Sequence, residues 1–210
     1  MPNDAALIAA TLQGDTDAFG MLVRQYQDRV FTAVYHVVGD RQEAEDLTQD
    51  AFVKAFVNLA SFRGQSSFFT WIYRIAFNVA ATRRQRKRPW VSLEARRDSL
   101  GPEPHDRGES VEEQFMREER AAETRSALAD LPEEFRTILV LREIEGCDYH
   151  TIAEILATPI GTVRSRLHRA RLELRNRLQA LSSKKTSGTT SENPSEEAAE
   201  KPTEKPTQKP

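Results

Sequence analysis

The apolar residues of this chain recur at three- and four-residue steps through two long stretches, residues 4–88 and 124–181. Nowhere do they alternate with polar residues over a run long enough for a half-buried strand. Three- and four-residue spacing places apolar side chains on one face of an α-helix, where they can pack against a second helix. The periodicity therefore predicts an all-α fold with two small helical domains.

The segments outside these two stretches have a different composition. Residues 89–123 contain Pro89, Pro102, Pro104, Gly101 and Gly108, and eight acids against three arginines lie between Gly101 and Glu123. This pattern predicts a flexible acidic linker that becomes helical near its end. Residues 182–210 lack aromatic residues, Leu, Ile and Val, which predicts a disordered tail. The tail is either inert or a contact for a regulator.

Composition excludes several classes of protein. The single cysteine, Cys147, rules out an internal disulfide framework and a cysteine-cluster metal site, and we interpret it as a small apolar filler more readily than as a redox sensor. The four histidines are scattered without ligand spacing, and no phosphate loop or nucleophile–base pair is recognisable. We therefore expect no enzyme activity, catalytic residue, metal or cofactor. Without a leader or a long apolar run, we expect a cytoplasmic protein with no membrane insertion.

Helix signals divide the first stretch into four helices. A short helix is expected at residues 4–12, and a second runs from near Asp17 until Gly39 ends it. Asp40 then has the position of an N-cap, and Glu43 completes the spacing of a capping box. A fourth helix follows Ser66 and Ser67.

The stretch at residues 61–80, SFRGQSSFFTWIYRIAFNVA, contains six of the sixteen aromatic residues. A helical wheel places four residues in one apolar stripe: Phe68, Ile72, Ile75 and Val79. Three others share a neighbouring face: Trp71, Arg74 and Asn78. Further rings lie on the remaining sides: Phe69, Tyr73 and Phe77. A helix that docks on one face does not need rings on three, so we expect some of them to have another partner.

Single-stranded DNA would suit this surface, because bases stack on rings and arginines attract phosphates. The alternative is that the rings wedge between the helices of the bundle. For Phe62, Phe68 and Phe69 the sequence favours this packing role at least as much as contact with DNA. The basic run RRQRKR at residues 83–88 directly follows. We favour phosphate contact for it over a solvated helix end.

The second stretch predicts a helix-turn-helix. PEEFRTILVLREI, residues 132–144, begins with proline and acids, and Gly146 closes this helix. Asp148 can cap the short helix YHTIAEIL, the turn ATPIG follows, and a longer helix runs to about Leu178.

The last helix has an apolar stripe and a basic remainder. The stripe consists of Val163, Leu167, Ala170, Leu174 and Leu178. The rest of its surface carries six arginines and one acid, Glu173. A solvated charged face is the alternative, but this bias on the second helix of a helix-turn-helix favours DNA in the major groove.

Three strings together resemble the extracytoplasmic-function (group IV, sigma-70 family) sigma factors of bacterial RNA polymerase. They are DAFGMLVRQYQDRVFTAVYHVVGDRQEAEDLTQDAFVKAF, FRGQSSFFTWIYRIAFNVA and LPEEFRTILVLREIEGCDYHTIAEILATPIGTVRSRLHRARLEL. They occur in the family's order and cover most of residues 15–178. Any one would be moderate evidence, since helix-turn-helix patterns are widespread, but the three together are very specific.

The resemblance implies a region 2-like domain at residues 4–88, a linker at 89–123 that threads the RNA-exit path, and a region 4-like domain at 124–181. It implies that an acidic helix binds the clamp helices of core RNA polymerase through Asp46, Leu47, Gln49, Asp50 and Phe52. It implies that the loop at 60–67 captures a base flipped from the minus-ten element.

Two residue sets follow for promoter DNA. The predicted minus-ten and single-strand contacts are Phe62, Arg63, Gln65, Ser66, Trp71, Arg74, Asn78, Arg83 and Arg84. The predicted minus-thirty-five contacts are Thr162, Arg164, Ser165, Arg166, His168 and Arg169. In addition, Ala157 stands where the family's turn commonly has Gly.

The resemblance thus predicts a sigma factor that directs promoter recognition, DNA opening and initiation, for a stress or envelope-type regulon. A cognate anti-sigma factor is an expected partner, beside core polymerase and double- and single-stranded promoter DNA. One rival is a free-standing helix-turn-helix regulator with an N-terminal sensor or dimerisation bundle. A second rival is an RNA-binding regulatory protein. The free-standing regulator does not explain the ring-rich surface or the acidic helix.

Overall fold

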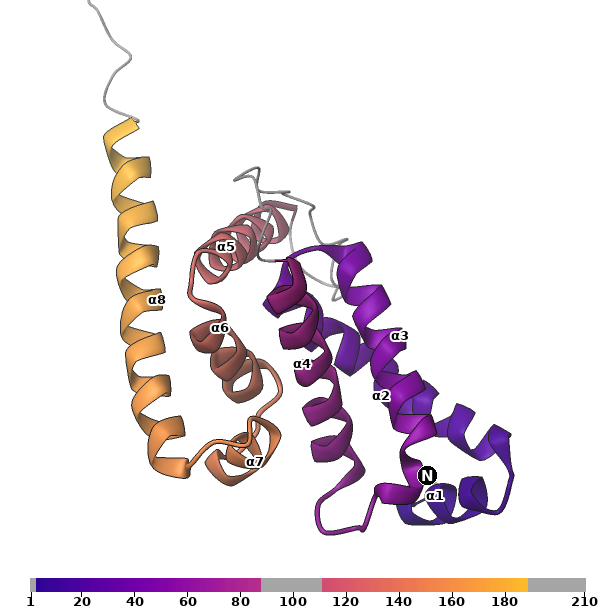
Figure 1. Cartoon of the computed structure of the whole chain (residues 1–210). Helices are drawn as coiled ribbons and strands as arrows, with labels where there is room; N and C mark the ends of the chain where they lie inside the picture. Colours follow the sequence, from indigo (N-terminus) through magenta and orange to yellow (C-terminus); the bar gives the residue numbers. More distant parts are fainter. Residues whose placement is uncertain (1–2, 88–110, 189–210) are drawn as a thin grey trace, which may run out of the picture.

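The computed structural model describes residues 3–87 and 111–188, and within these ranges all regular structure is helical, as predicted (Figure 1). The N-terminal unit, residues 3–87, contains α1 (Asp4–Leu12), α2 (Thr16–Val38), α3 (Arg41–Val57), the 3₁₀ turn η1 (Leu59–Ser61) and α4 (Phe68–Lys87). The C-terminal unit, residues 111–188, contains α5 (Val111–Ala129), α6 (Glu133–Leu139), the π-helical turn η2 (Val140–Ile144), α7 (Tyr149–Ile155) and α8 (Ile160–Gly188).

The predicted caps are present. The Asp40 carboxylate accepts from the amide of Glu43 at 2.8 Å at the start of α3, and Gly39 ends α2 at φ 78°. The Asp148 carboxylate accepts from the amide of Thr151 at 2.7 Å at the start of α7. Each side chain satisfies an amide that has no partner within its own helix.

Two helices extend beyond their predicted limits. α5 begins at Val111, inside the segment predicted as linker, and residues 88–110 lie outside the described residues. α8 continues to Gly188, through the first residues of the predicted tail. There the hydroxyls of Ser182 and Ser183 donate to the carbonyls of Leu178 and Gln179, which a helix accommodates. The predicted disorder of residues 189–210 lies outside the described residues.

Each unit has an apolar interior, as the wheels predicted. In the N-terminal unit Leu22, Val34, Leu47, Phe68 and Ile72 are at most 2% exposed. In the C-terminal unit Ile138, Leu141, Ile152, Val163 and Leu167 are equally buried. The turn before α8 contains Ala157 at φ 47°, the only non-glycine residue with positive φ in the described ranges. Alanine thus adopts here the backbone conformation that glycine favours.

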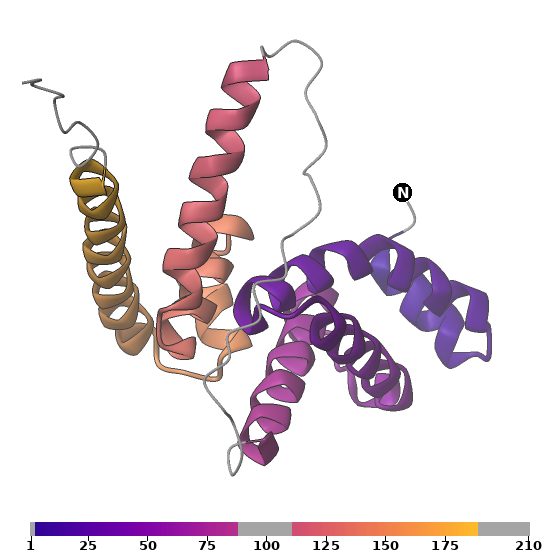
Figure 2. The same cartoon turned by 90° about the horizontal axis from the view of Figure 1, so that it is seen from above.

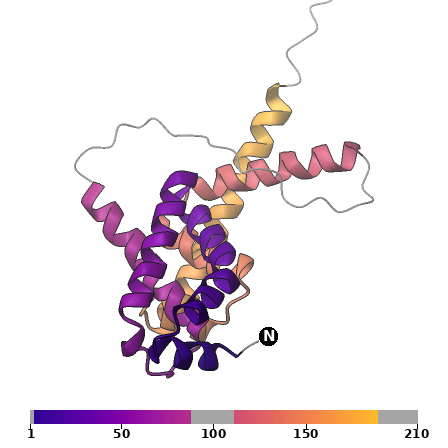
Figure 3. The same ribbon diagram turned by 90° about the vertical axis from the view of Figure 1, so that its right-hand side faces the viewer.

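The two units pack against each other. α4 contacts α7, and α2 contacts α5, α6 and η2 (Figure 2). The buried guanidinium of Arg136 crosses the boundary, where it donates to the carbonyl of Val37 at 2.5 Å and to those of Ala129 and Leu131 at 2.5 and 2.9 Å. The N-terminal part of α5 and the C-terminal part of α8 project from this packed body (Figure 3). The sequence indicated two domains but did not indicate this contact between them.

Candidate nucleic-acid interface

The predicted single-strand face lies along α4 and the loop before it. Trp71 is half-buried and packs on Phe62 and Phe68, with ring centroids 5.2 and 5.8 Å apart. Trp71, Asn78 and Lys54 line one groove of about 310 Å³ between α3 and α4. This groove brings together an aromatic ring, an amide and an ammonium group, which are the groups that a stacked base and its phosphate require.

A second hollow, of about 300 Å³, joins the predicted base-capture loop to α4. Gln65, Ser66, Trp71 and Arg74 line it together with Glu154 of α7. The loop turns at Gly64, which has φ 67°, and Arg63 and Gln65 are exposed. Ser67 fixes the start of α4, because its hydroxyl accepts from the amide of Thr70 at 3.1 Å. The structure therefore collects most of the predicted minus-ten residues in one area.

The rings on the other side of α4 have a different partner. Tyr73 is 1% exposed and contacts the ring of Phe69, with centroids 4.2 Å apart, while Phe77 is also buried. Burial and the neighbouring carboxylate of Glu145, from the C-terminal unit, raise the pKa of Tyr73. Tyr73 thus belongs to the contact between the units, and it is not available to DNA in this conformation.

Cys147 lies in the same area and is buried, as the interpretation as an apolar filler requires. Burial, followed by the charge of Glu145, raises the pKa of the Cys147 thiol to about 11. A thiol that stays protonated at neutral pH is a poor nucleophile.

Most of the arginines predicted to contact the single strand have protein partners in this conformation. Arg74 donates through Nε to the carbonyl of Glu154 at 3.0 Å, and Arg84 forms an ion pair with Glu133 of α6. Arg83 pairs with Asp46 of α3 at 3.0 Å. Arg63 and Asn78 are exposed on the same area.

The predicted polymerase-binding residues on α3 divide into two groups. Leu47 is fully buried and Phe52 is only 6% exposed, although Phe52 lines a groove on this side of α3. Contact of these two residues with core polymerase stays a prediction. They lie in the bundle interior and fix α3 in place. Gln49 and Asp50 are exposed, and Asp46 is half-buried against Arg83.

Sequence reasoning missed three exposed apolar residues of α3. Val57, at the end of the helix, is 73% exposed, and Val53 and Phe56 are 56% and 45% exposed. Val53 and Phe56 line a groove of about 740 Å³ together with Phe19 and Phe31 of α2 and with Gln49. The signal was present in the sequence, because Val53 and Phe56 fall outside the stripe of Ala44, Leu47, Ala51 and Ala55.

The basic face of α8 has the orientation that the wheel predicted. Val163, Leu167 and Ala170 are buried, whereas Arg164, Ser165, His168 and Arg169 are exposed. Two arginines of this helix are ion-paired with the rest of the unit. Arg166, a predicted DNA contact, is half-buried and approaches Glu134 at 3.3 Å, and Arg171 pairs with Glu143 at 2.7 Å.

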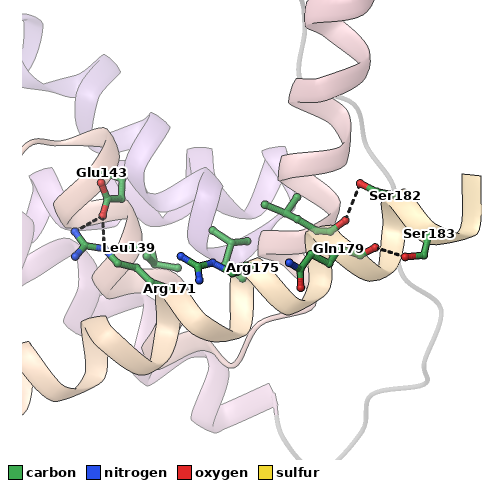
Figure 4. A pocket seen from close by; sticks show the side chains of 9 residues that line it. Leu139, Glu143, Arg171, Arg175, Gln179, Ser182 and Ser183 are labelled. Atoms are coloured by element: carbon green, nitrogen blue, oxygen red, sulfur yellow. Dashed lines mark hydrogen bonds and ion pairs between the residues drawn. The ribbon is translucent and has the colours of Figure 1, made fainter. Parts of the chain in front are cut away.

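Further along α8 a shallow groove of about 810 Å³ lies beside α6 and η2 (Figure 4). Leu139, Leu174 and Leu178 form its apolar floor, and Arg171 and Arg175 flank it. None of the predicted minus-thirty-five residues lines it, so it is separate from the basic face.

The described residues contain neither a metal cluster nor a membrane span. Within 3–87 and 111–188, no three histidine, cysteine or acidic side chains come together as a metal site would require. No helix in the same ranges has the length and apolar character needed to cross a membrane.

Known proteins match this chain along most of its length. The family Sigma-70 region 2 matches residues 22–89, and the family Sigma-70, region 4 matches residues 121–174. The RNA polymerase sigma-H factor of Pseudomonas aeruginosa is 40% identical over 183 residues, which cover 85% of this chain and 95% of that protein. The ECF RNA polymerase sigma-E factor of Haemophilus influenzae is 37% identical over 184 residues, covering 85% and 96%.

Solved structures match the fold as well. CnrH, in complex with the cytosolic domain of CnrY, has a TM-score of 0.62 at 25% identity and covers 84% of this chain and 97% of that chain. The sigma factor RpoE of Bartonella quintana, in complex with the anti-sigma factor NepR, has a TM-score of 0.59 at 24% identity and covers 77% and 96%.

The chain therefore belongs to the sigma-70 family of RNA polymerase sigma factors, within its extracytoplasmic-function group. As a sigma factor it binds core RNA polymerase and directs promoter recognition and transcription initiation.

Proposed function

We propose that three separate surfaces of this chain perform the work of a sigma factor: the outer side of α3 for core polymerase, the loop and α4 for the minus-ten element, and α8 for the minus-thirty-five element. The observation that carries the proposal is the groove that Trp71, Asn78 and Lys54 share. A free-standing regulator that binds only duplex DNA does not need a ring, an amide and a cation in one groove. A protein that binds a melted strand does need them.

The proposed minus-ten surface extends from this groove to the loop at 60–67. Unstacking a base costs a few kcal/mol, and stacking on an aromatic ring restores about 1–3 kcal/mol per base. Trp71 is half-buried on Phe62 and Phe68, so its ring is held in place before the strand arrives. Gln65 and Ser66 supply hydrogen-bonding groups at the adjacent hollow.

The proposed polymerase surface combines charge with exposed apolar area. Gln49 and Asp50 lie on the same helix as Val53 and Phe56, whose side chains are about half exposed. Exposed large apolar residues beside a groove are typical of protein–protein contacts. We place Leu47 beneath this surface, Phe52 in the lining of its groove, and Asp46 beside it, where its carboxylate pairs with Arg83.

The proposed minus-thirty-five surface is the exposed face of α8. Arg164, Ser165, His168 and Arg169 lie on the side opposite the buried stripe, where a major groove can receive the helix. Arg166 has a supporting position in this proposal, because its guanidinium pairs with Glu134. Thr162 lies in the first turn of the helix and is half-buried.

We also propose that this chain acts in the cytoplasm with polymerase, performs no covalent chemistry, and serves a stress or envelope-type regulon under an anti-sigma factor. RpoE of Bartonella quintana was solved in complex with an anti-sigma factor, and CnrH was likewise solved with a bound partner. The partner of this chain would have to cover at least one of the three surfaces in order to inhibit it.

Reconstitution with core RNA polymerase tests the proposal. Transcripts from genomic DNA fragments should have defined 5′ ends only when the protein is present, and they should share two upstream elements. The variant Val53→Asp should bind core polymerase more weakly while its melting curve stays unchanged. The matched control is Val57→Asp, because Val57 is 73% exposed on the same helix and does not line the groove. Operator binding without polymerase and without initiation would favour the regulator, and preferential binding of RNA would favour the second rival.

A further inference from the structure

Gly20 lies inside α2, which is an unfavourable place for a glycine. Glycine loses more conformational freedom on folding than alanine does, so it destabilises the interior of a helix. Gly39, which ends the same helix, has φ 78° and thus uses a conformation that other residues avoid. Gly20 is not among the glycines with positive φ. The backbone of α2 therefore does not require a glycine at this position.

The packing of the protein does not require a glycine there either. Beyond the adjacent residues and the backbone of α2 itself, a Cβ added to Gly20 would have one heavy atom within 4 Å, Nη1 of Arg24 at 3.8 Å. This distance is an ordinary van der Waals contact. An alanine would fit the free protein, so the fold leaves the glycine unexplained.

Gly20 does, however, line the groove between α2 and α3. On α2 the lining residues recur at four- and three-residue steps and so form one row along the helix: Thr16, Gly20, Val23 and Gln27. Such a row of side chains makes a ridge on the helix surface. The missing side chain of Gly20 interrupts this ridge with a notch between Thr16 and Val23.

The notch lies beside apolar surface that is partly exposed. The ring of Phe19, the residue before Gly20, contacts the ring of Phe56 with centroids 5.0 Å apart. Phe56 and Val53 are 45% and 56% exposed, and both line the groove. A notch with such a border fits a protruding apolar side chain of a partner, in the way that ridges of one helix pack into grooves of another.

The lining also indicates the chemistry of the partner. Asp28 and Glu45 line the groove, although Glu45 also pairs with Arg41, and no lysine or arginine of the described residues lines it. A partner helix that carries basic residues beside its apolar ones complements this surface. Gln49, one of the predicted polymerase-binding residues, lines the same groove. Because a sigma factor binds core RNA polymerase, the polymerase is the partner that this continuity favours.

We infer that Gly20 is a specificity-determining residue for polymerase binding, because its missing side chain leaves a notch that receives one large apolar side chain of core RNA polymerase. The inference rests on the proposed polymerase surface of α3 and extends it to α2. Gly20 lowers the stability of the free protein and keeps the notch open.

This role makes stability and binding respond in opposite directions. Gly20→Ala should raise the Tm by about 2 °C, because alanine reduces the conformational freedom of the unfolded chain. It should also raise the Kd for core polymerase about tenfold, because the added methyl group overpacks the contact. Gly20→Leu, which fills the notch, should weaken binding further.

The matched control is the same substitution at Gly161. This glycine lies in α8, an added Cβ would meet nothing within 4 Å, and the residue is outside the groove. Gly161→Ala should leave the affinity for core polymerase unchanged. All variants are full-length chains, their dissociation constants are measured on immobilised core polymerase, and their melting curves are followed by circular dichroism.

Each outcome has one meaning. A higher Tm together with weaker binding in Gly20→Ala, and still weaker binding in Gly20→Leu, supports the inference. Native affinity in Gly20→Ala and Gly20→Leu overturns it, and so does a lower Tm in Gly20→Ala, since the fold would then require the glycine. Equal weakening in Gly161→Ala also overturns it. Val53→Asp, measured beside them, separates the two proposals: native affinity in that variant contradicts the polymerase surface itself, whereas weak binding there with native binding in both Gly20 variants contradicts only the role of Gly20.

Discussion

Arg74 of α4 donates through Nε to the backbone carbonyl of Glu154 of α7 at 3.0 Å, across the boundary between the two units. One side chain of the predicted minus-ten surface is thus bonded to the helix-turn-helix unit. Arg84 repeats the relationship with Glu133. The predicted minus-ten surface is therefore bonded to the C-terminal unit in this conformation, although the two are far apart in the sequence.

The first prediction concerns DNA opening. Trp71→Ala and Asn78→Ala should reduce the yield of heparin-resistant open complexes more than they reduce the affinity for core polymerase, because both residues line the groove on α4 and lie away from the exposed surface of α3. Removal of the stacking ring should cost about 1–3 kcal/mol in strand capture. Equal loss of opening and of polymerase binding would contradict the assignment of Trp71 and Asn78 to the melted strand.

The second prediction compares two arginines of α8. Arg169 is exposed on the basic face, whereas Arg166 pairs with Glu134 at 3.3 Å. Arg169→Ala should cost about 1–3 kcal/mol in binding to the correct minus-thirty-five duplex and should relax the base preference at one position. Arg166→Ala should have a smaller and sequence-independent effect. Competition binding with single-base duplex variants measures the affinity of both variants. An equal loss of affinity for all duplexes in Arg169→Ala would identify Arg169 as a phosphate contact.

The third prediction concerns two turns with positive φ. Gly146 has φ 69° and an added Cβ would meet nothing within 4 Å, so Gly146→Ala should lower stability through the backbone alone, by about 1 kcal/mol. Ala157 already has φ 47°, so Ala157→Gly relieves strain while it increases the freedom of the unfolded chain. We expect a change within about 1 kcal/mol of native stability. Urea unfolding provides both values, and a large loss for Ala157→Gly would contradict this account of the turn.

The fourth prediction concerns alkaline pH. Burial, followed by a hydrogen bond to Asp4 at 2.6 Å, raises the pKa of Tyr26 to about 12. The unfolded chain loses this proton near pH 10, so between about pH 10 and 12 the unfolded state binds fewer protons than the native state, and stability falls as pH rises. The midpoint of urea unfolding should therefore decrease over this range. Tyr26→Phe should reduce the slope, leaving the contribution of Tyr73, and an unchanged slope would refute this cause.

Local signals in the sequence predicted much of the fold. The caps at Asp40 and Asp148 depend on residues three positions away, and most of the predicted apolar stripes of α4 and α8, which depend on spacing within one helix, are buried. The exceptions are Ile75, Leu174 and Leu178, which are half-buried. Such features need no knowledge of distant contacts. The same wheels oriented the exposed face of α8 correctly.

The contact between the units could not be predicted in this way. Arg136 reaches the carbonyl of Val37, 99 residues away in the chain, and no periodicity indicates such a pair. Tyr73 illustrates the consequence, because the wheel placed its ring outside the stripe but could not identify Glu145 as its neighbour. Leu47 is a different case, because resemblance assigned it a polymerase contact and packing, which the resemblance did not indicate, buries its side chain completely.

The most direct test of the central claim, that this chain opens promoter DNA through α4, is permanganate modification of a promoter template. With core polymerase and the native protein, thymines near the start site should become reactive, and with polymerase alone they should not. The same template with Trp71→Ala should show clearly weaker reactivity at equal polymerase binding. Reactive thymines in the absence of the protein, or full reactivity with Trp71→Ala, would contradict the account.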